Sequence, residues 1–227
     1  MTCWDPTSWI LENWCALPGV GMTDIHHQAA SQRSTLYHHL AEMLTYPSKD
    51  LLQNCRSGEQ DRAMVNLLHI FPYELSWQLD TCSQDDSVTT MASEYMRVFE
   101  LPIQGQPCPL YGGLYGGNRH EVMEELLRYY RFYGLSIDKA STGDLPDSIP
   151  TLLEFLQFLT YKEADTGETS ELLSIRLTQK DLLERHLTKW VPAIRSQMEQ
   201  RNAPAFYMGT ITLLNAFIFK ELSNLTD

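Results

Sequence analysis

The sequence predicts an all-α protein, built as a single helical bundle. Apolar side chains recur at 3- and 4-residue spacings through most of the 227 residues, which is the period of an α-helix. Sustained alternation of apolar and polar residues, the period of a strand, is missing from the sequence. Apolar residues make up 43% of the chain and charged residues 20%, so the side chains suffice for one large core.

The N-terminal part of the sequence stands apart from the predicted bundle. Trp4, Trp9 and Trp14 recur every five residues, so on a helix they would spread around the surface rather than form one stripe. We interpret residues 1–27 as a tryptophan-rich extension, either packed on the domain or available to a partner. Residues 28–227 are then the helical domain.

The predicted bundle begins with residues 29–46, where Leu36, Leu40 and Leu44 share one face and Pro47 stops the helix. Further segments with the same spacing precede a stretch that is rich in glycine and proline. They are residues 60–71, 73–79 and 87–101.

Longer helical segments follow the glycine-rich stretch. Gly134 is a natural end for the segment 119–135, because glycine readily adopts the left-handed conformation that closes many helices. The segment 144–164 carries its leucines on one face, which we expect to point inward: Leu152, Leu153, Leu156 and Leu159. The last helical segments are residues 170–194 and 203–225.

The most apolar window of the sequence, residues 205–219, is predicted to be a buried helix. Gly209 and Asn215 interrupt it, and it falls short of the roughly 20 apolar residues that a membrane-spanning helix needs. The first residues lack the basic and apolar regions of a secretory signal. The five cysteines form no CxxC pair, which fits a reducing compartment. We expect a cytoplasmic protein without stable membrane insertion.

The charge of the chain favours basic partners. Its 29 acidic residues exceed its 17 lysines and arginines, which gives a formal net charge of −12. Such a field repels the phosphates of nucleic acids and attracts cationic peptides or basic proteins. We therefore expect no nucleic-acid partner.

The sequence contains no recognisable catalytic or metal-binding constellation. His38 and Glu42 could share a helical face, but neither an HExxH motif nor the paired ExxH motifs of di-iron bundles occur. Cys108, between two prolines, is the best reactive-thiol candidate, and we interpret it as structural. We predict no catalytic residues, no metal and no cofactor.

The stretch at residues 105–119 raises one alternative, a nucleotide- or small-molecule-binding enzyme. Gly112 and Gly117 have the spacing of the two P-loop glycines. Asn118 and Arg119 follow them, where a P-loop has a lysine and a hydroxyl residue. The stretch is therefore more typical of an irregular connection, in which glycines turn the chain and prolines stop the preceding helix.

The start of the segment 144–164 carries acidic residues that suit an arginine ligand. Asp147 or Ser148 can cap the first helical turn, and Glu154 lies among apolar neighbours. A guanidinium group binds a carboxylate with two parallel hydrogen bonds, which are stronger than neutral ones. On spacing alone, the favoured interpretation is that these residues are the cap and the exposed edge of a core helix.

Five sequence stretches together resemble the TorD/DmsD/NarJ family of cytoplasmic chaperones for molybdenum-containing oxidoreductases. They are EYMRVFELP, CPLYGGLYGG, LPDSIPTLLEFLQFL, HLTKWVPAI and AFYMGTITLLNAF, in this order between about residues 30 and 223. The third and fourth look closest to the NarJ-like branch, which includes chaperones of dimethyl sulfide and ethylbenzene dehydrogenase-type enzymes.

The resemblance implies a helical chaperone that binds the N-terminal region or twin-arginine leader of an apo catalytic subunit. It also implies that the chaperone holds this subunit until the molybdenum cofactor is inserted, before export. Ser148 stands where many members have histidine, so no pH-sensitive role transfers to that position. The residues matching the family's motifs, and hence implied to bind the peptide, are Glu94, Arg97, Phe99, Tyr111, Gly112, Tyr115, Asp147, Ser148, Glu154 and Phe155.

These observations combine into one hypothesis for function. Acidic side chains beside an apolar helical groove would capture a basic leader peptide, with the apolar contacts holding it and the acids setting its position and on-rate. The glycine-rich stretch would serve as a rim or hinge of that groove. We expect a monomer or a domain-swapped dimer, since residues 141–146 form a linker that permits such a swap.

Overall fold

The computed structural model describes residues 22–77, 88–101, 107–136 and 145–226, and it confirms the predicted all-α class. Across these ranges the only β-type pairing is an isolated antiparallel bridge between Tyr111 and Ser148. Nor does any helix in these ranges have the length and apolarity needed to cross a bilayer. The tryptophans of the N-terminal extension and most of the 141–146 linker lie outside the described residues.

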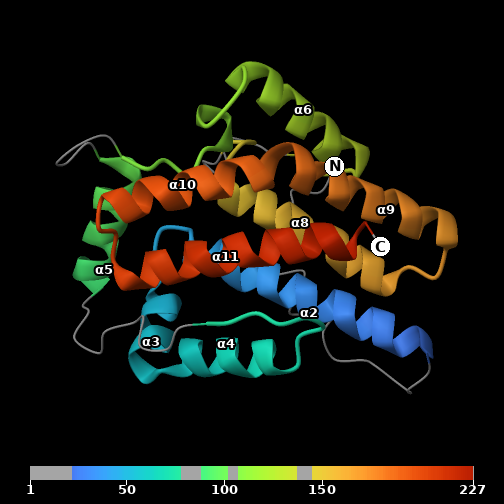
Figure 1. Ribbon diagram of the computed structural model, residues 1–227, viewed down its shortest axis with the longest axis horizontal. Coiled ribbons are helices and arrows are strands. Elements are labelled where there is room, and N and C mark those ends of the chain that lie inside the picture. The colour runs from blue at the N-terminus through green and yellow to red at the C-terminus, as the bar shows by residue number, and fades with distance from the viewer. Residues whose placement is uncertain (1–21, 78–87, 102–106, 137–144, 227) are drawn as a thin grey trace.

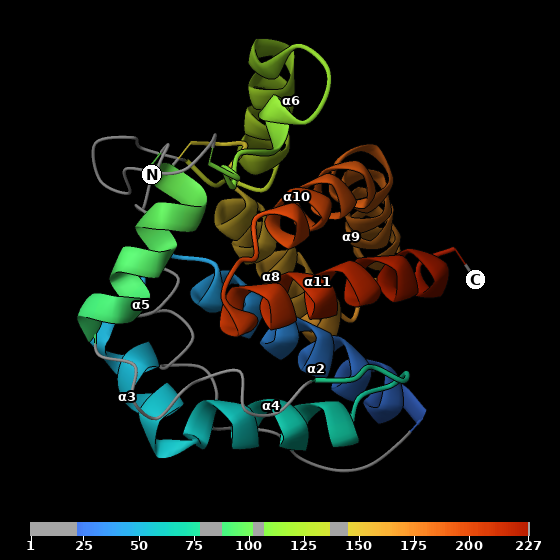
Figure 2. The same ribbon diagram turned by 60° about the vertical axis from the view of Figure 1, so that its left-hand side comes forward.

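The helices form a bundle with α2, α8 and α11 in its middle, α3 and α4 on one side, and α6 on the opposite side (Figures 1 and 2). The short helical turns η1, η2 and η3 connect them. In chain order the elements are α2 (Met22–Met43), α3 (Lys49–Ser57), α4 (Glu59–His69), α5 (Val88–Tyr95), η1 (Met96–Glu100), η2 (Gly112–Leu114), α6 (Arg119–Phe132), α8 (Ile149–Asp165), α9 (Thr169–Leu182), η3 (Leu183–Leu187), α10 (Thr188–Gln200) and α11 (Ala205–Asn224).

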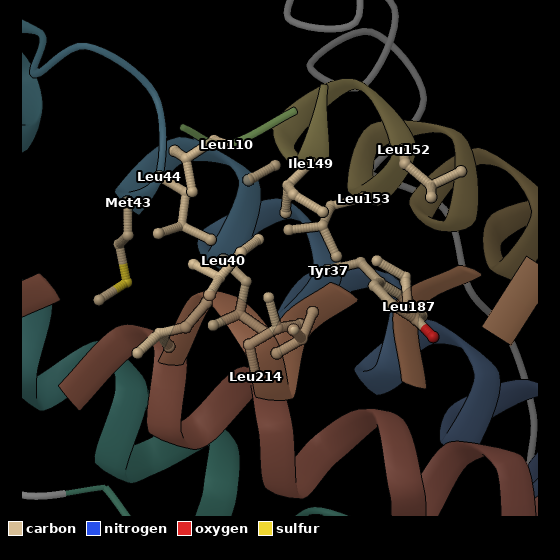
Figure 3. Packing of buried hydrophobic residues seen from close by; sticks show 14 of the residues in the cluster. Tyr37, Leu40, Met43, Leu44, Leu110, Ile149, Leu152, Leu153, Leu187 and Leu214 are labelled. Carbon is tan, nitrogen blue, oxygen red and sulfur yellow. The ribbon is translucent and has the colours of Figure 1, made fainter. Parts of the chain in front are cut away.

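The apolar core fills the space between α2, α8 and α11, as Figure 3 shows. The leucine faces predicted from spacing are confirmed, because Leu36 and Leu40 of α2 are fully buried, as is Leu44, the residue that follows α2. The predicted inward leucines of α8 are fully buried as well: Leu152, Leu153, Leu156 and Leu159. Helix α11 is a buried helix, as its composition indicated.

An ion network also lies inside this bundle. Arg33 of α2 donates to both carboxylate oxygens of Glu221, at 2.7 and 2.9 Å, and to those of Glu163, both at 3.1 Å. Its remaining nitrogen donates to Gln179, at 2.7 Å. Burial acts to lower the pKa of Arg33, but the two carboxylates outweigh it and raise that pKa. The network therefore joins α2, α8, α9 and α11 at one point.

Three local features differ from the expectations. Helix α2 runs from Met22 to Met43, so it begins seven residues before the predicted segment 29–46 and ends three residues before that segment does. The predicted helix after Pro72 is wrong over residues 73–77, which belong to neither a helix nor a strand. There Tyr73 donates to Glu221, and the Trp77 indole nitrogen donates to Asp61 at 2.9 Å. Helix α3 was not predicted, although its cap signals are present in the sequence: Ser48 accepts from the N–H of Leu51, and Gly58 closes the helix with φ +68°.

Candidate peptide-binding site

The glycine-rich stretch is joined by backbone hydrogen bonds to the start of α8. The N–H of Gly112 donates to the carbonyl of Asp147, at 2.7 Å, and the N–H of Ile149 donates to the carbonyl of Leu110, at 2.8 Å. These bonds flank the bridge between Tyr111 and Ser148. We call this meeting point of residues 110–113, Arg119 and residues 147–149 the junction.

Asp147 of the junction binds a guanidinium group that comes from the same chain. Its side chain is 0% exposed, and Arg119 donates to both oxygens, from Nε at 2.7 Å and from an Nη atom at 3.2 Å. The Arg119 guanidinium also lies over the ring of Tyr111, 5.1 Å from its centroid. The hydrogen bond to Asp147 raises the pKa of Arg119. The junction is thus already shaped to hold a guanidinium in bidentate geometry against an aromatic face.

The two glycines of the junction are required by close packing. A Cβ atom on Gly112 would lie 1.8 Å from a ring carbon of Trp190. A Cβ atom on Gly113 would lie 2.7 Å from Cγ of Arg119 and 2.9 Å from Oδ2 of Asp147. The backbone therefore passes between the indole and the ion pair, where any side chain would collide with one of them.

The same geometry argues against a phosphate site in this stretch. The cation that would face a phosphate, Arg119, is bound to Asp147. Asn118 caps the N-terminus of α6 by accepting from the N–H of His120, at 3.1 Å, and Glu121 lies in the first turn. A phosphate here would meet carboxylates rather than free donors. Among the described residues, no group of three or more His, Cys, Asp or Glu side chains could hold a metal ion.

The other predicted residues of α8 are buried or half-buried. Ser148 is the N-cap by position, but its side chain makes no capping hydrogen bond. Phe155 is buried, and its ring packs against Tyr130 and Tyr133 of the α6 region, at 4.8 and 5.7 Å between centroids. Glu154 is half-buried. Phe155 therefore holds α6 on α8 from within the core.

The predicted residues before the glycines lie on α5 and η1. Glu94 and Arg97 form an ion pair at 2.6 Å, with about a third of each side chain exposed. Phe99 is buried against Tyr95 and Tyr207, at 5.0 and 5.2 Å between centroids.

Cys108 connects η1 to the start of the junction by a backbone hydrogen bond. The buried Cys108 donates its N–H to the carbonyl of Val98, at 2.8 Å, which links η1 to the junction. Tyr115 is half-buried, and burial raises its pKa. The structure therefore gathers Tyr111, Gly112, Asp147 and Ser148 at the junction and places Glu94, Arg97 and Phe99 on the adjoining helix.

The structure also contains a groove between α6 and α9 that none of the predicted residues line. Its walls carry acidic residues from α6 and exposed apolar residues from both helices. The acids of α6 are visible in the sequence. Their position opposite α9 depends on tertiary packing, which no sequence spacing reveals.

A family model described as the nitrate reductase delta subunit matches residues 72–196, which is more than half of the chain. The chain belongs to the nitrate reductase delta subunit family. This confirms, at the level of the family, the resemblance read from the sequence. All the predicted site residues, from Glu94 to Phe155, lie inside the matched range.

Three curated relatives of this chain are named as assembly chaperones. The perchlorate reductase assembly chaperone protein of Dechloromonas aromatica (strain RCB) is 29% identical over 205 residues, covering 85% of this chain and 89% of the relative. The selenate reductase assembly chaperone protein of Thauera selenatis is 31% identical over 113 residues. The chlorate reductase assembly chaperone protein of Ideonella dechloratans is 31% identical over 116 residues. The last two matches each cover 48% of this chain and 58% of the relative.

Proposed function

We propose that this protein is a cytoplasmic assembly chaperone, and no enzyme, for a molybdenum-containing oxidoreductase. It binds the N-terminal leader region of the apo catalytic subunit and holds the subunit until its cofactor is inserted, before export. Membership of the delta subunit family and the printed names of three reductase assembly chaperones support the role. The net charge of −12 supports a basic segment as the ligand.

The observation that carries the proposed binding site is the bidentate pair between Arg119 and Asp147. Arg119 occupies the place that we assign to an arginine of the leader: two hydrogen bonds to a buried carboxylate, with the Tyr111 ring on one face. Arg119 thus acts as a resident competitor, that is, an intramolecular ligand that competes with the leader arginine for the Asp147 carboxylate. In the proposed complex the leader arginine replaces it, and Arg119 turns outward.

The exposure of the two partners favours this exchange. Asp147 is sealed, whereas the Arg119 side chain is 32% exposed, so solvent reaches the guanidinium and not the carboxylate. Exchanging one bidentate pair for another changes little free energy by itself. The net affinity then comes from apolar contacts of the leader and from long-range attraction by the acidic chain.

The remaining predicted residues take supporting roles in this proposal. We assign Glu154 the role of a second carboxylate for the leader and Tyr115 that of a wall residue; both side chains are half-buried. Glu94 and Arg97 extend the site along the adjoining helix. Phe155 and Phe99, which are buried, hold the helices that frame it.

Substitutions at the two members of the pair should change leader binding in opposite directions. With a labelled twin-arginine leader peptide, we expect Asp147→Asn to weaken binding by about tenfold, which corresponds to about 1.4 kcal/mol. We expect Arg119→Gln to tighten it several-fold, because the resident competitor is removed. Fluorescence anisotropy at two salt concentrations measures both, and binding of the wild type should weaken as salt rises.

Arg62→Gln provides the matched control, because Arg62 is an exposed arginine on α4, which lies on the side of the bundle opposite α6 (Figure 1). It makes the same change in net charge as Arg119→Gln and should leave the affinity unchanged. Equal affinities for Asp147→Asn, Arg119→Gln and wild type, with all three folded by circular dichroism, would exclude the proposed carboxylate site. Co-purification of the untagged catalytic subunit, with and without molybdenum supply, tests the chaperone role itself.

A further inference from the structure

The groove between α6 and α9 lies outside the junction and has a volume of about 850 Å³. The two helices run antiparallel along it. Near one end the Tyr133 hydroxyl lies 2.9 Å from that of Thr178, and near the other end Arg185 lies 2.6 Å from Glu125. The lining residues are Glu121, Glu124, Glu125, Arg128, Tyr129, Phe132, Ser174, Leu177, Thr178, Asp181 and Arg185.

One end of the groove is apolar and open to solvent. Phe132 is 73% exposed and Leu177 is 64% exposed. Leu173 precedes Leu177 by one helical turn on α9 and is 58% exposed. These are the three most exposed large apolar side chains in the described ranges of the chain. Single exposed apolar side chains are ordinary on a protein surface. A cluster of the most exposed ones beside a groove indicates a surface that a binding partner covers.

The other end of the groove is acidic. Glu121 and Glu124 of α6 are exposed, and Glu125 lies one position further along the helix. Four carboxylates line the groove against two guanidinium groups, and one of these, Arg185, already contacts Glu125 at 2.6 Å and Asp181 at 3.4 Å.

His186 lies behind this acidic end. It is buried, and its Nε2 is 3.8 Å from Glu125 and has no hydrogen-bond partner among the residues that the structure describes. Burial lowers the pKa of His186 to about 4, so at neutral pH the imidazole adds no positive charge.

We propose that this groove docks a basic amphipathic helix of a partner protein. Basic side chains of that helix meet the Glu121–Glu125 end, and its apolar side chains cover Phe132 and Leu177. The distance along α6 from Glu121 to Phe132 is about 16 Å, the length of about three helical turns. This surface is separate from the Asp147 junction and does not require the leader to bind there.

Charge complementarity selects this occupant over two others. A second copy of the chain would bring another net charge of −12 to an acidic surface, so like charges would oppose pairing. The chain's own residues 1–21 contain Asp5 and Glu12 and no lysine or arginine, so they lack the basic end that the groove requires.

The test uses the full chain and two labelled synthetic helical peptides of identical composition. One carries its arginines at one end and its leucines and phenylalanines at the other; the second has them evenly mixed. We expect the segregated peptide to bind at least about fivefold tighter by fluorescence anisotropy. Glu121→Gln with Glu124→Gln should weaken its binding about fivefold, and Phe132→Ser with Leu177→Ser about tenfold.

Matched controls come from the α4 side of the molecule. Glu59→Gln with Glu74→Gln removes the same charge from exposed positions, and Ile70→Ser removes an apolar side chain that is 57% exposed. Both controls should bind like the wild type. Equal losses in groove and control variants would mean diffuse attraction to an acidic protein and would overturn the proposal.

Two further measurements separate this proposal from its rivals. Asp147→Asn should leave the preference for the segregated peptide over the mixed one unchanged, because both peptides offer the junction the same arginines. Failure at the junction and failure at the groove therefore give different results. Size-exclusion chromatography with light scattering tests for a second copy. If the wild type is dimeric and Phe132→Ser with Leu177→Ser makes it monomeric, the groove is a self-association surface and the proposal is wrong.

Discussion

The centre of the bundle and helix α6 use the same kind of bond in two different settings. In the centre, Arg33 binds Glu163 and Glu221, and the exposed fraction of each side chain is below a tenth. On α6, Arg119 binds an equally sealed carboxylate, Asp147, but is itself 32% exposed. Helix α8 buries most of its length, whereas α6 buries Leu126 and Tyr130. Figure 2 shows α6 standing above the remaining helices.

This difference indicates which contacts can be exchanged. A buried arginine with two carboxylates cannot leave without stranding charges in an apolar interior. A partly exposed arginine such as Arg119 can rotate its guanidinium group out into the solvent. Water, or the guanidinium group of a ligand, can then take its place beside the carboxylate. Helix α6 is also the element that both the proposed leader site and the proposed groove share. Partner binding would therefore act on the less buried region and leave the centre intact.

The largest expected effect comes from breaking the central network. Arg33→Met leaves Glu163 and Glu221 without their shared partner, so we expect a loss of about 3 to 5 kcal/mol in the free energy of unfolding, or a failure to fold. Arg119→Met should cost about 1 to 2 kcal/mol, because water can reach the vacated position. Urea denaturation of both variants measures the difference. Equal losses would contradict the distinction between centre and α6.

The next effect concerns the boundary between the two regions, where the glycine-rich stretch crosses Trp190. Gly112→Ala places a methyl group into the indole ring, and we expect a loss of about 2 to 3 kcal/mol from overpacking. Gly116→Ala is the control, since a Cβ atom there meets no other atom within 4 Å. Thermal unfolding of the two variants should therefore separate them clearly. A similar melting temperature for both would show that the loop moves away from Trp190 without cost.

The smallest effect is a dependence of stability on pH near α6. His186 has a pKa of about 4 in the folded chain, below its ordinary value of 6.5. Burial is the main cause. The neighbouring Glu125 is 3.8 Å away but is already engaged by Arg185. Between pH 6.5 and pH 4 the unfolded chain binds the proton and the folded chain does not, so stability falls as the pH is lowered through this range.

His186→Gln should remove this part of the acid sensitivity. Both proteins should lose stability between pH 7 and pH 5. We expect the loss in the free energy of unfolding to be about 1 to 2 kcal/mol smaller for His186→Gln than for the wild type. Urea denaturation at the two pH values measures this, and only the change with pH matters, since the variant's absolute stability can differ. Parallel pH profiles for the two proteins would show that His186 is protonated in the folded state or exposed to water.

The spacing of apolar residues was sufficient to predict much of the bundle. Particular residues show where prediction from spacing failed. The leucines of α8 repeat with the helical period, so their burial followed from the sequence. The irregular, non-helical course of residues 73–77 did not follow from the sequence, because Tyr73 hydrogen-bonds to the distant Glu221 and this contact overrides a helical pattern. Helix α3 has a serine cap and a closing glycine, but it is too short for spacing alone to stand out.

The predicted site residues stay a prediction, because no bound peptide is present. Asp147 was predicted to receive an arginine of the leader, whereas the guanidinium that the structure shows on it belongs to the same chain. Its source, Arg119, lies 28 positions away in the chain, and no motif connects the two. The groove was missed altogether, because whether Phe132 and Leu177 are covered or exposed depends on how α6 and α9 pack.

By itself, the amino-acid sequence determined the helical class, the inward faces of the main helices and the acidic character of the protein. These properties depend on the order and charge of side chains along the chain, which short-range sterics and composition fix. Only the tertiary structure decided that Asp147 is sealed by Arg119, that Gly112 must lie against Trp190, and that α6 and α9 enclose an acidic and apolar groove. Each of these depends on contacts between residues distant in sequence, and the free energy of such contacts exists only once the helices have packed.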